Sequence, residues 1–150
     1  MAKEPKRVLV AGATGYLGKY VVGAFKQRGY WVRALARSEE RLAEPGPFTA
    51  PGIGPDDVDD VFIGEISKPE TLDGLLDDID PVYSSVGISR QRDGLTFDQV
   101  DYQCNHNLIE LCADSEVERF VDVSMQGADE PAIADLAITK AHEKVVAELA

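Results

Sequence analysis

Three glycines near the N-terminus have the spacing of a phosphate-binding turn. They follow a short apolar run, residues 8–11, and precede a segment with helical periodicity. Glycine permits a tight turn, allows the backbone to approach a phosphate and lets the next helix pack close to a strand. The N-terminus of that helix adds unpaired N–H groups and the positive end of its dipole. The turn consists of Gly12, Ala13, Thr14, Gly15, Tyr16, Leu17 and Gly18.

The position of this turn indicates that it binds a dinucleotide. The alternative is a plain tight turn without a ligand. A dinucleotide carries a pyrophosphate, and such a turn binds it when a strand precedes the glycines and a helix follows them. Both conditions are met, and the turn opens a pattern of alternating strands and helices. The spacing is GxxGxxG rather than the GxGxxG of many dinucleotide-binding turns.

Arg37 indicates which dinucleotide is bound. About twenty residues after the glycines, an NAD-binding protein carries an acidic residue that binds the ribose 2'-hydroxyl. A guanidinium there binds a 2'-phosphate instead, in bidentate fashion. With Ser38 beside it and Arg33 and Arg41 near it, Arg37 predicts NADP, and NAD is the alternative. In a second interpretation these arginines pair with Glu39, Glu40 and Glu44.

Short apolar runs that alternate with amphipathic segments predict the framework that positions these residues. The pattern is typical of a parallel sheet buried on both faces, with right-handed crossovers between strands. We expect a Rossmann-type, doubly wound α/β/α fold with three layers, five strands and strand order 3-2-1-4-5. The expected strands are residues 8–11, 31–36, 61–63, 81–86 and 119–123.

Helices are expected in four places. Leu17, Val21 and Ala24 predict the buried face of the first helix, which Gly29 ends. Four prolines and three glycines predict an irregular loop over residues 44–55. The other expected helices are residues 69–76, 97–111 and 133–150.

Composition narrows the class of protein. The net charge of -12 opposes binding to nucleic acids and anionic membranes. The N-terminal apolar run is too short for a signal peptide or a membrane span, so we expect a cytoplasmic protein.

Cys104 and Cys112 lie eight residues apart on one expected helix, about 12 Å, which is too far for a disulfide. Their spacing does not predict a metal site.

The glycine turn resembles that of the extended and atypical short-chain dehydrogenase/reductases. Within that family, the sequence is most similar to the NmrA-like group. This group includes isoflavone-reductase-like and divinyl-reductase-like enzymes and cofactor-sensing regulators. Residues 32–37, 100–109 and 117–124 resemble further blocks of that group, so the resemblance covers nearly the whole chain. It implies an NAD(P)-binding protein.

The resemblance also implies contacts beyond the turn. At the end of the third strand the family has an aspartate and an apolar residue beside the adenine, where this chain has Glu65 and Ile66. Val86 and Gly87 are implied on the nicotinamide side. The expected cofactor-binding residues are Gly12, Thr14, Gly15, Tyr16, Leu17, Gly18, Arg37, Ser38, Glu65, Ile66, Val86, Gly87 and Lys140.

The catalytic residues that the resemblance implies are incomplete in this chain. The family uses a tyrosine as acid/base, a lysine four residues later and a serine that orients the substrate. The serine corresponds to Ser124 and the lysine to Lys140, but Leu136 stands at the tyrosine position. Ser124 and Lys140 remain the candidate catalytic residues. His106 and His142 are expected at a helix surface or cap.

Three functions are open. The first is an NADPH-dependent reductase acting on an unidentified small molecule, and the second is a non-catalytic NADP sensor or scaffold. The third, an NAD-dependent nucleotide-sugar epimerase or dehydratase, is weakened most by the missing tyrosine.

We expect residues 1–150 to form one domain, the N-terminal part of a longer protein, because the last helical pattern has no stop signal. A homo-oligomer is compatible with the sequence.

Overall fold

Five strands form one parallel sheet in the order β3-β2-β1-β4-β5, which confirms the predicted topology. The computed structural model describes residues 4–91 and 93–150. The strand order reverses between β1 and β4, and this reversal is the topological switch point of a Rossmann fold. The strands are β1 (Arg7–Ala11), β2 (Trp31–Ala36), β3 (Asp60–Ile63), β4 (Val82–Ser84) and β5 (Phe120–Asp122).

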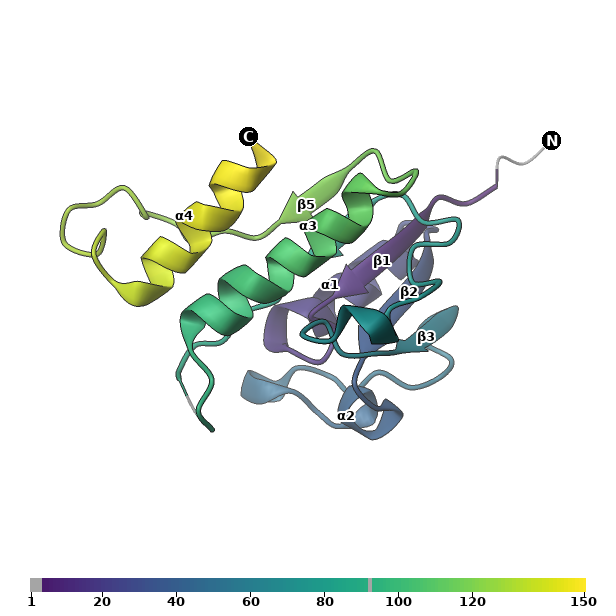
Figure 1. Ribbon diagram of the computed structural model, residues 1–150. Coiled ribbons are helices and arrows are strands. Elements are labelled where there is room, and N and C mark those ends of the chain that lie inside the picture. Colours follow the sequence, from purple (N-terminus) through teal and green to yellow (C-terminus); the bar gives the residue numbers. More distant parts are fainter. Residues whose placement is uncertain (1–3, 92) are drawn as a thin grey trace.

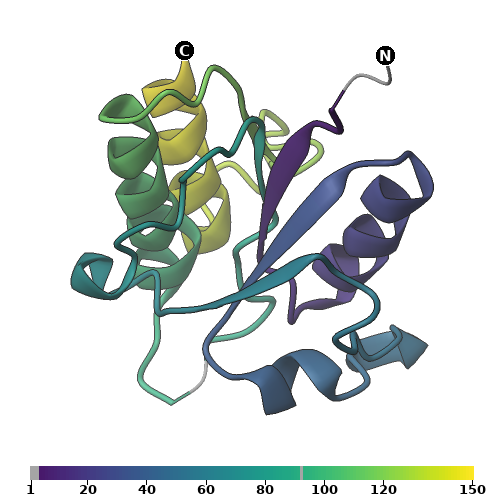
Figure 2. The same cartoon turned by 90° about the vertical axis from the view of Figure 1, so that its right-hand side faces the viewer.

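Helices cover both faces of this sheet (Figure 1). The helices are α1 (Tyr16–Gln27), α2 (Glu39–Ala43), α3 (Asn105–Ala113) and α4 (Ala137–Leu149). A π-helical segment, η3 (Asp98–Cys104), leads into α3, and η1 (Pro47–Thr49) and η2 (Pro69–Thr71) are short 3-10 segments. Figure 2 shows α1 on one face of the sheet and the neighbouring α3 and α4 on the other.

Successive residues of β1 enter two different cores. Val8 and Val10 pack with Val22 of α1 on one face, and Leu9 packs with Leu108 of α3 on the other. All five side chains are buried. Burial of each stabilises the fold by about 1.5–3 kcal/mol. The strand is apolar throughout because both of its faces are covered.

The first helix turns only part of the predicted face to the core, because Val21 packs against the core and Leu17 does not. Gly18, Lys19 and Val22 are buried, whereas Leu17 is 40% exposed. The reason is the glycine at position 18, which brings the helix so close to the turn that the backbone of Gly12 occupies the space of a side chain.

Two other predicted helices begin or end elsewhere. Residues 69–76 form only η2 and further turns, because Gly74 adopts a φ of +77°, outside the helical region. The last helix begins at Ala137 rather than at residue 133, and residues 133–135 form turns. Leu136 is its N-cap residue, with an extended backbone (ψ 143°).

The polar segment after β2 forms the short helix α2, which the sequence did not predict. Its first turn is capped by the side chain of Ser38, whose Oγ accepts a hydrogen bond from the Arg41 N–H at 3.3 Å. Residues 44–55 are irregular apart from η1, as predicted. Ala50 and Ile53 of this loop are buried and fasten it to the domain.

Cys104 and Cys112 are buried free thiols. Burial raises the pKa of the Cys112 thiol to about 12. Among residues 4–91 and 93–150, no group of three or more His, Cys, Asp and Glu side chains could hold a metal ion. None of the helices in this part of the chain has the length and apolar character to cross a membrane.

Candidate dinucleotide site

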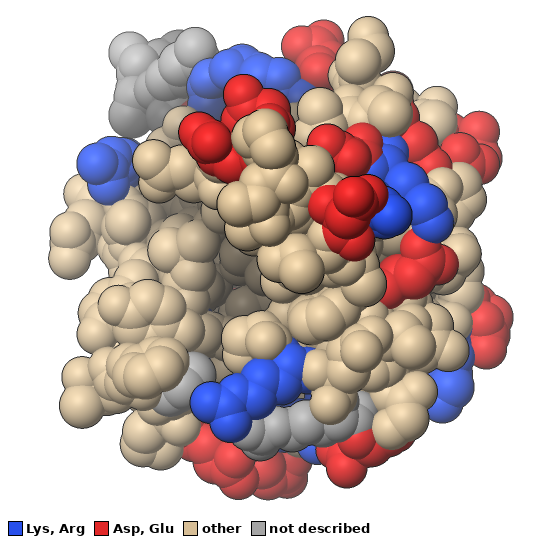
Figure 3. Space-filling view, turned by 90° about the vertical axis from the view of Figure 1, so that its left-hand side faces the viewer, with Lys and Arg blue, Asp and Glu red and all other residues tan. Residues whose placement is uncertain are grey.

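The residues singled out by the sequence gather where the parallel strands end. The glycine turn follows β1, Arg37 follows β2, Glu65 lies two residues after β3, and Val86 lies two residues after β4. In a doubly wound sheet, ligands bind at this edge beside the switch point. Figure 3 looks onto the side toward which β1 points and shows a hollow surrounded mainly by uncharged side chains.

The glycine turn is folded tightly enough to require its glycines. Gly12 has a φ of +83°, and a Cβ on it would come within 2.9 Å of the Ser85 backbone. A Cβ on Gly18 would come within 2.0 Å of the Gly12 carbonyl oxygen. Gly15 caps α1 without a side-chain hydrogen bond, so the first turn of the helix keeps its amides for an anion. Thr14 is half-buried in the turn, whereas Tyr16 and Leu17 are exposed.

The three arginines near the expected phosphate position have different environments. Arg37 is exposed at the end of β2. Arg33 points elsewhere: its Nε donates to Asp60 at 2.6 Å and its Nη1 to the Leu75 carbonyl at 2.8 Å. The interpretation of Arg33 as part of an anion site is therefore wrong, because its guanidinium is used within the fold. Arg41 lines a shallow pocket of about 360 Å³.

The alternative pairing of these arginines also fails. Among residues 4–91 and 93–150, no ion pair joins Arg33, Arg37 or Arg41 to the glutamates of α2 or to Glu44. The charge of Arg37 acts on Glu65 instead. The pKa of the Glu65 carboxyl lies below its usual value because Lys68 and Ser67 donate hydrogen bonds to it, and Arg37 adds to this effect.

Lys19 is a buried cation that sequence reasoning missed. It is 2% exposed, and its Nζ donates to the Leu42 carbonyl at 2.6 Å, which ties α1 to the end of α2. Burial lowers the pKa of Lys19, partly against the charge of Glu44. Lys19 lines the same pocket as Thr14 and Arg41, so this link holds the glycine turn and α2 around one opening. A lysine in a first helical turn gives no sequence signal of burial.

Ile66 is half-buried after β3, where it could pack against an adenine ring. Its backbone carbonyl accepts a hydrogen bond from Nδ2 of Asn107 on α3 at 2.9 Å. Glu65 is held by its bonds to Lys68 and Ser67, both at 2.9 Å. The structure therefore places the two residues at the predicted edge, each with a hydrogen-bonded neighbour.

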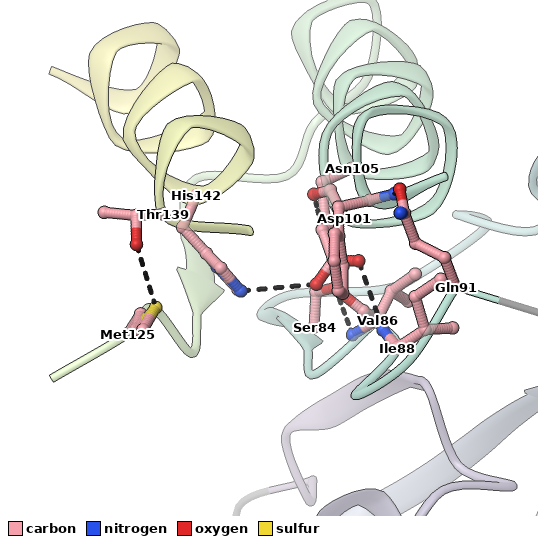
Figure 4. A network of polar contacts seen from close by, with 10 residues as sticks. Ser84, Val86, Ile88, Gln91, Asp101, Asn105, Met125, Thr139 and His142 are labelled. Carbon is pink, nitrogen blue, oxygen red and sulfur yellow. Dashed lines mark hydrogen bonds and ion pairs between the residues drawn. The ribbon is translucent and has the colours of Figure 1, made fainter. Parts of the chain in front are cut away.

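A polar network anchors the segment after β4 to α3 (Figure 4). Ser84 Oγ donates to Asn105 Oδ1 at 2.6 Å and accepts from the Val86 N–H at 3.2 Å. Nδ2 of Asn105 donates to the Val86 carbonyl at 3.1 Å. The residues implied on the nicotinamide side, Val86 and Gly87, thus belong to a segment that hydrogen bonds tie to α3. Ser84 and Asn105 position it without facing the solvent.

Asp101 and His142 extend this network to α4. Asp101 accepts a hydrogen bond from the Ile88 N–H at 3.2 Å, and His142 Nε2 lies 3.3 Å from its other carboxylate oxygen. The prediction that His142 lies at a surface or cap is wrong, because its side chain is only 13% exposed. His106 lies farther toward solvent and bonds Glu148 at 2.8 Å.

The candidate catalytic residues lie on or near α4. Ser124 is exposed after β5, and Lys140 is exposed on α4 with its Nζ 3.3 Å from Asp135. Leu136 is 48% exposed one helical turn before Lys140. No hydrogen bond joins Ser124 to Lys140 within the described part of the chain. The structure thus leaves an exposed apolar side chain at the tyrosine position.

The sheet order and the glycine turn at the switch point define an NAD(P)-binding Rossmann domain. The chain belongs to the NAD(P)H-binding family, whose model matches residues 12–148. It is thus a member of the NmrA-like, atypical short-chain dehydrogenase/reductase group that its sequence resembles.

Curated relatives of two kinds match nearly the whole chain. Photosystem II assembly factor Ycf39 of Synechocystis is 34% identical over 143 residues, which are 95% of this chain and 41% of that protein. Divinyl chlorophyllide a 8-vinyl-reductase of Zea mays is 30% identical over 152 residues, with coverage of 95% and 36%. The chain thus spans about two fifths of the length of these relatives.

A solved structure shows the same fold. It is a putative NAD-dependent epimerase/dehydratase from Bacillus halodurans, with a TM-score of 0.75 at 22% identity, covering 96% of this chain and 64% of that one. At this identity the likeness concerns the fold.

Proposed function

We propose that this chain is the NADPH-binding part of an oxidoreductase that reduces a small molecule. The observation that carries the choice of cofactor is Arg37, an exposed cation at the end of β2, where an NAD-binding protein would carry an acid. Arg41 supports it, because it lines a pocket beside the glycine turn together with Thr14 and Lys19. Cations at this place favour a nucleotide with an additional phosphate.

The proposed roles of the other residues follow from their places. The amides of the glycine turn bind the pyrophosphate, Ile66 packs on the adenine, and Val86 and Gly87 line the nicotinamide side. When bound, the cofactor supplies the hydride. Ser124 orients the substrate and Lys140 holds the ribose. Because Leu136 has no proton to donate, the proton comes from water or a substrate hydroxyl.

A second candidate function is an NADP sensor or scaffold without turnover. Leu136 at the tyrosine position favours it, and so does the similarity to a protein named as an assembly factor. In this case dinucleotide binding would alter contacts with a partner through a shift between conformations. An epimerase or dehydratase is less compatible with the site, since that chemistry depends on the tyrosine base.

Cofactor titrations combined with turnover assays test the proposal. We expect the wild-type protein to bind NADPH more tightly than NADH by calorimetry. We also expect it to oxidise NADPH with a member of a panel of quinones, enones and aldehydes. Tighter binding of NADH would contradict the assignment of Arg37. Tight NADPH binding without turnover on any compound would favour the sensor.

Lys140→Ala tests the proposed ribose contact. Nζ of Lys140 has one exposed ionic partner, Asp135. The substitution is therefore expected to change the free energy of unfolding by no more than about 0.5 kcal/mol. Loss of a charge-assisted contact is expected to weaken NADPH binding about 10-fold. Lys144→Ala is the matched control, because Lys144 lies on the same helix as Lys140 and pairs with Asp98 of η3 instead. Equal NADPH affinity in both variants would remove Lys140 from the site.

A further inference from the structure

A buried carboxylate lies directly behind the segment expected to line the nicotinamide. Asp101 is 1% exposed, and the Ile88 N–H donates to its Oδ2 at 3.2 Å. Its Oδ1 lies so close to Gly87 that a Cβ on that glycine would come within 2.6 Å of it. A charge buried in this way needs a hydrogen-bonded or ionic partner. Asp101 is thus a negative charge held against the cofactor segment.

His142 supplies the partner from a different element. Its Nε2 lies 3.3 Å from Asp101 Oδ1, and the two side chains are 13% and 2% exposed. Figure 4 shows the ring reaching from α4 toward Asp101. The hydrogen bond to Asp101 raises the pKa of His142 above its usual 6.5, against the opposing effect of burial.

Asp122 of β5 is the other titratable group that faces His142. Its Oδ2 and the Nδ1 of His142 are both buried without a hydrogen-bond partner among the described residues. Burial raises the pKa of Asp122, and Asp101 acts in the same direction while His142 opposes it. Asp122 therefore favours its neutral form more than an exposed carboxyl does. The proton on His142 then decides whether the charge of Asp101 is compensated.

We propose that Asp101 and His142 form a charge switch that sets the preference between oxidised and reduced dinucleotide, an inference that rests on the proposed cofactor site. The two redox forms differ at the nicotinamide ring, which is cationic in NADP⁺ and neutral in NADPH. When His142 is protonated, it compensates Asp101. When His142 is neutral, the carboxylate attracts the cationic ring through the protein interior, where charges interact more strongly than in water.

The direction of the pH effect follows from the raised pKa. Because its pKa lies above the usual value, His142 loses its proton at a higher pH than an exposed histidine does. Compensation of Asp101 is thus present at low pH and lost at high pH. A rising pH strengthens the binding of NADP⁺ relative to NADPH.

The test is to titrate the wild-type protein with NADP⁺ and with NADPH from about pH 5.5 to about pH 8.5. The ratio of the two Kd values is used because a 2'-phosphate also titrates near pH 6, equally in both forms, and cancels. We expect Kd(NADPH)/Kd(NADP⁺) to rise about tenfold across this range.

Three variants assign the effect. His142→Gln removes the titrating group and Asp101→Asn removes the charge on which it acts, so both are expected to give a ratio that does not depend on pH. His106→Gln is the matched control. The chain has two histidines, and His106 pairs with Glu148 rather than with Asp101. This control is expected to keep the dependence of the wild type.

Histidine NMR on the wild type provides a measurement that no folding defect can obscure. Linkage requires NADP⁺ to lower the pKa of His142 further than NADPH does. A pH-independent ratio in the wild type, or equal His142 pKa values in the two complexes, would overturn the switch and leave the cofactor site intact. Failure of both redox forms to bind at every pH would overturn the proposed function, and the switch with it.

Discussion

Arg37→Ala is expected to weaken NADPH binding by about 10- to 150-fold, the loss that corresponds to a charge-assisted hydrogen-bonding partner worth about 1.5–3 kcal/mol. NADH lacks the 2'-phosphate and is expected to keep its affinity. The side chain is exposed at the end of β2 and makes no hydrogen bond within the described part of the chain. We therefore expect the free energy of unfolding to change by no more than about 0.5 kcal/mol.

The matched control for this experiment is Arg28→Ala. Arg28 is also exposed, and its substitution also removes one positive charge from an acidic protein. Its guanidinium donates to the Ala24 carbonyl at the end of α1, away from the carboxyl ends of the strands. A comparable loss of NADPH affinity in both variants would indicate a general electrostatic effect. Equal losses for NADH and NADPH in Arg37→Ala would contradict a 2'-phosphate contact.

Gly18→Ala is expected to lower the free energy of unfolding by about 1–3 kcal/mol and to weaken binding of both dinucleotides at least tenfold. The added Cβ would lie 2.0 Å from the Gly12 carbonyl oxygen and 2.9 Å from the Ala13 Cα. Both neighbours are backbone atoms, so the turn itself must move. A displaced turn no longer presents its amides to the pyrophosphate.

Gly23→Ala is the control within the same helix. A Cβ at Gly23 would meet no heavy atom within 4 Å, so the substitution removes only the flexibility of glycine. It is expected to raise the free energy of unfolding by about 0.5–1 kcal/mol and to leave dinucleotide binding unchanged. Urea denaturation measures the free energy of unfolding of both variants. Equal shifts of the same sign would contradict the close contact of Gly18 with the turn.

Features that depend on neighbours along the chain were determined by the sequence alone. The glycine turn, its place between a strand and a helix, and the limits of β2 all follow from the local order of residues. The parallel sheet follows as well, because apolar runs alternate with amphipathic segments and crossovers have one hand. The order 3-2-1-4-5 is the one typical of folds with a dinucleotide-binding turn after the first strand. The positions of Arg37, Glu65 and Val86 at one edge then follow from the parallel direction of the strands.

The tertiary structure decided which charged side chains near the site form contacts within the fold. Arg33 contacts Asp60 and the Leu75 carbonyl, and Lys19 contacts the Leu42 carbonyl, across distances in sequence that no periodicity encodes. His142 pairs with Asp101, 41 positions earlier, because α4 packs against η3. Such contacts depend on the packing of two elements and on the direction of each side chain. A helical pattern gives the buried face only approximately, as the exposed Leu17 and the buried Gly18 of α1 show.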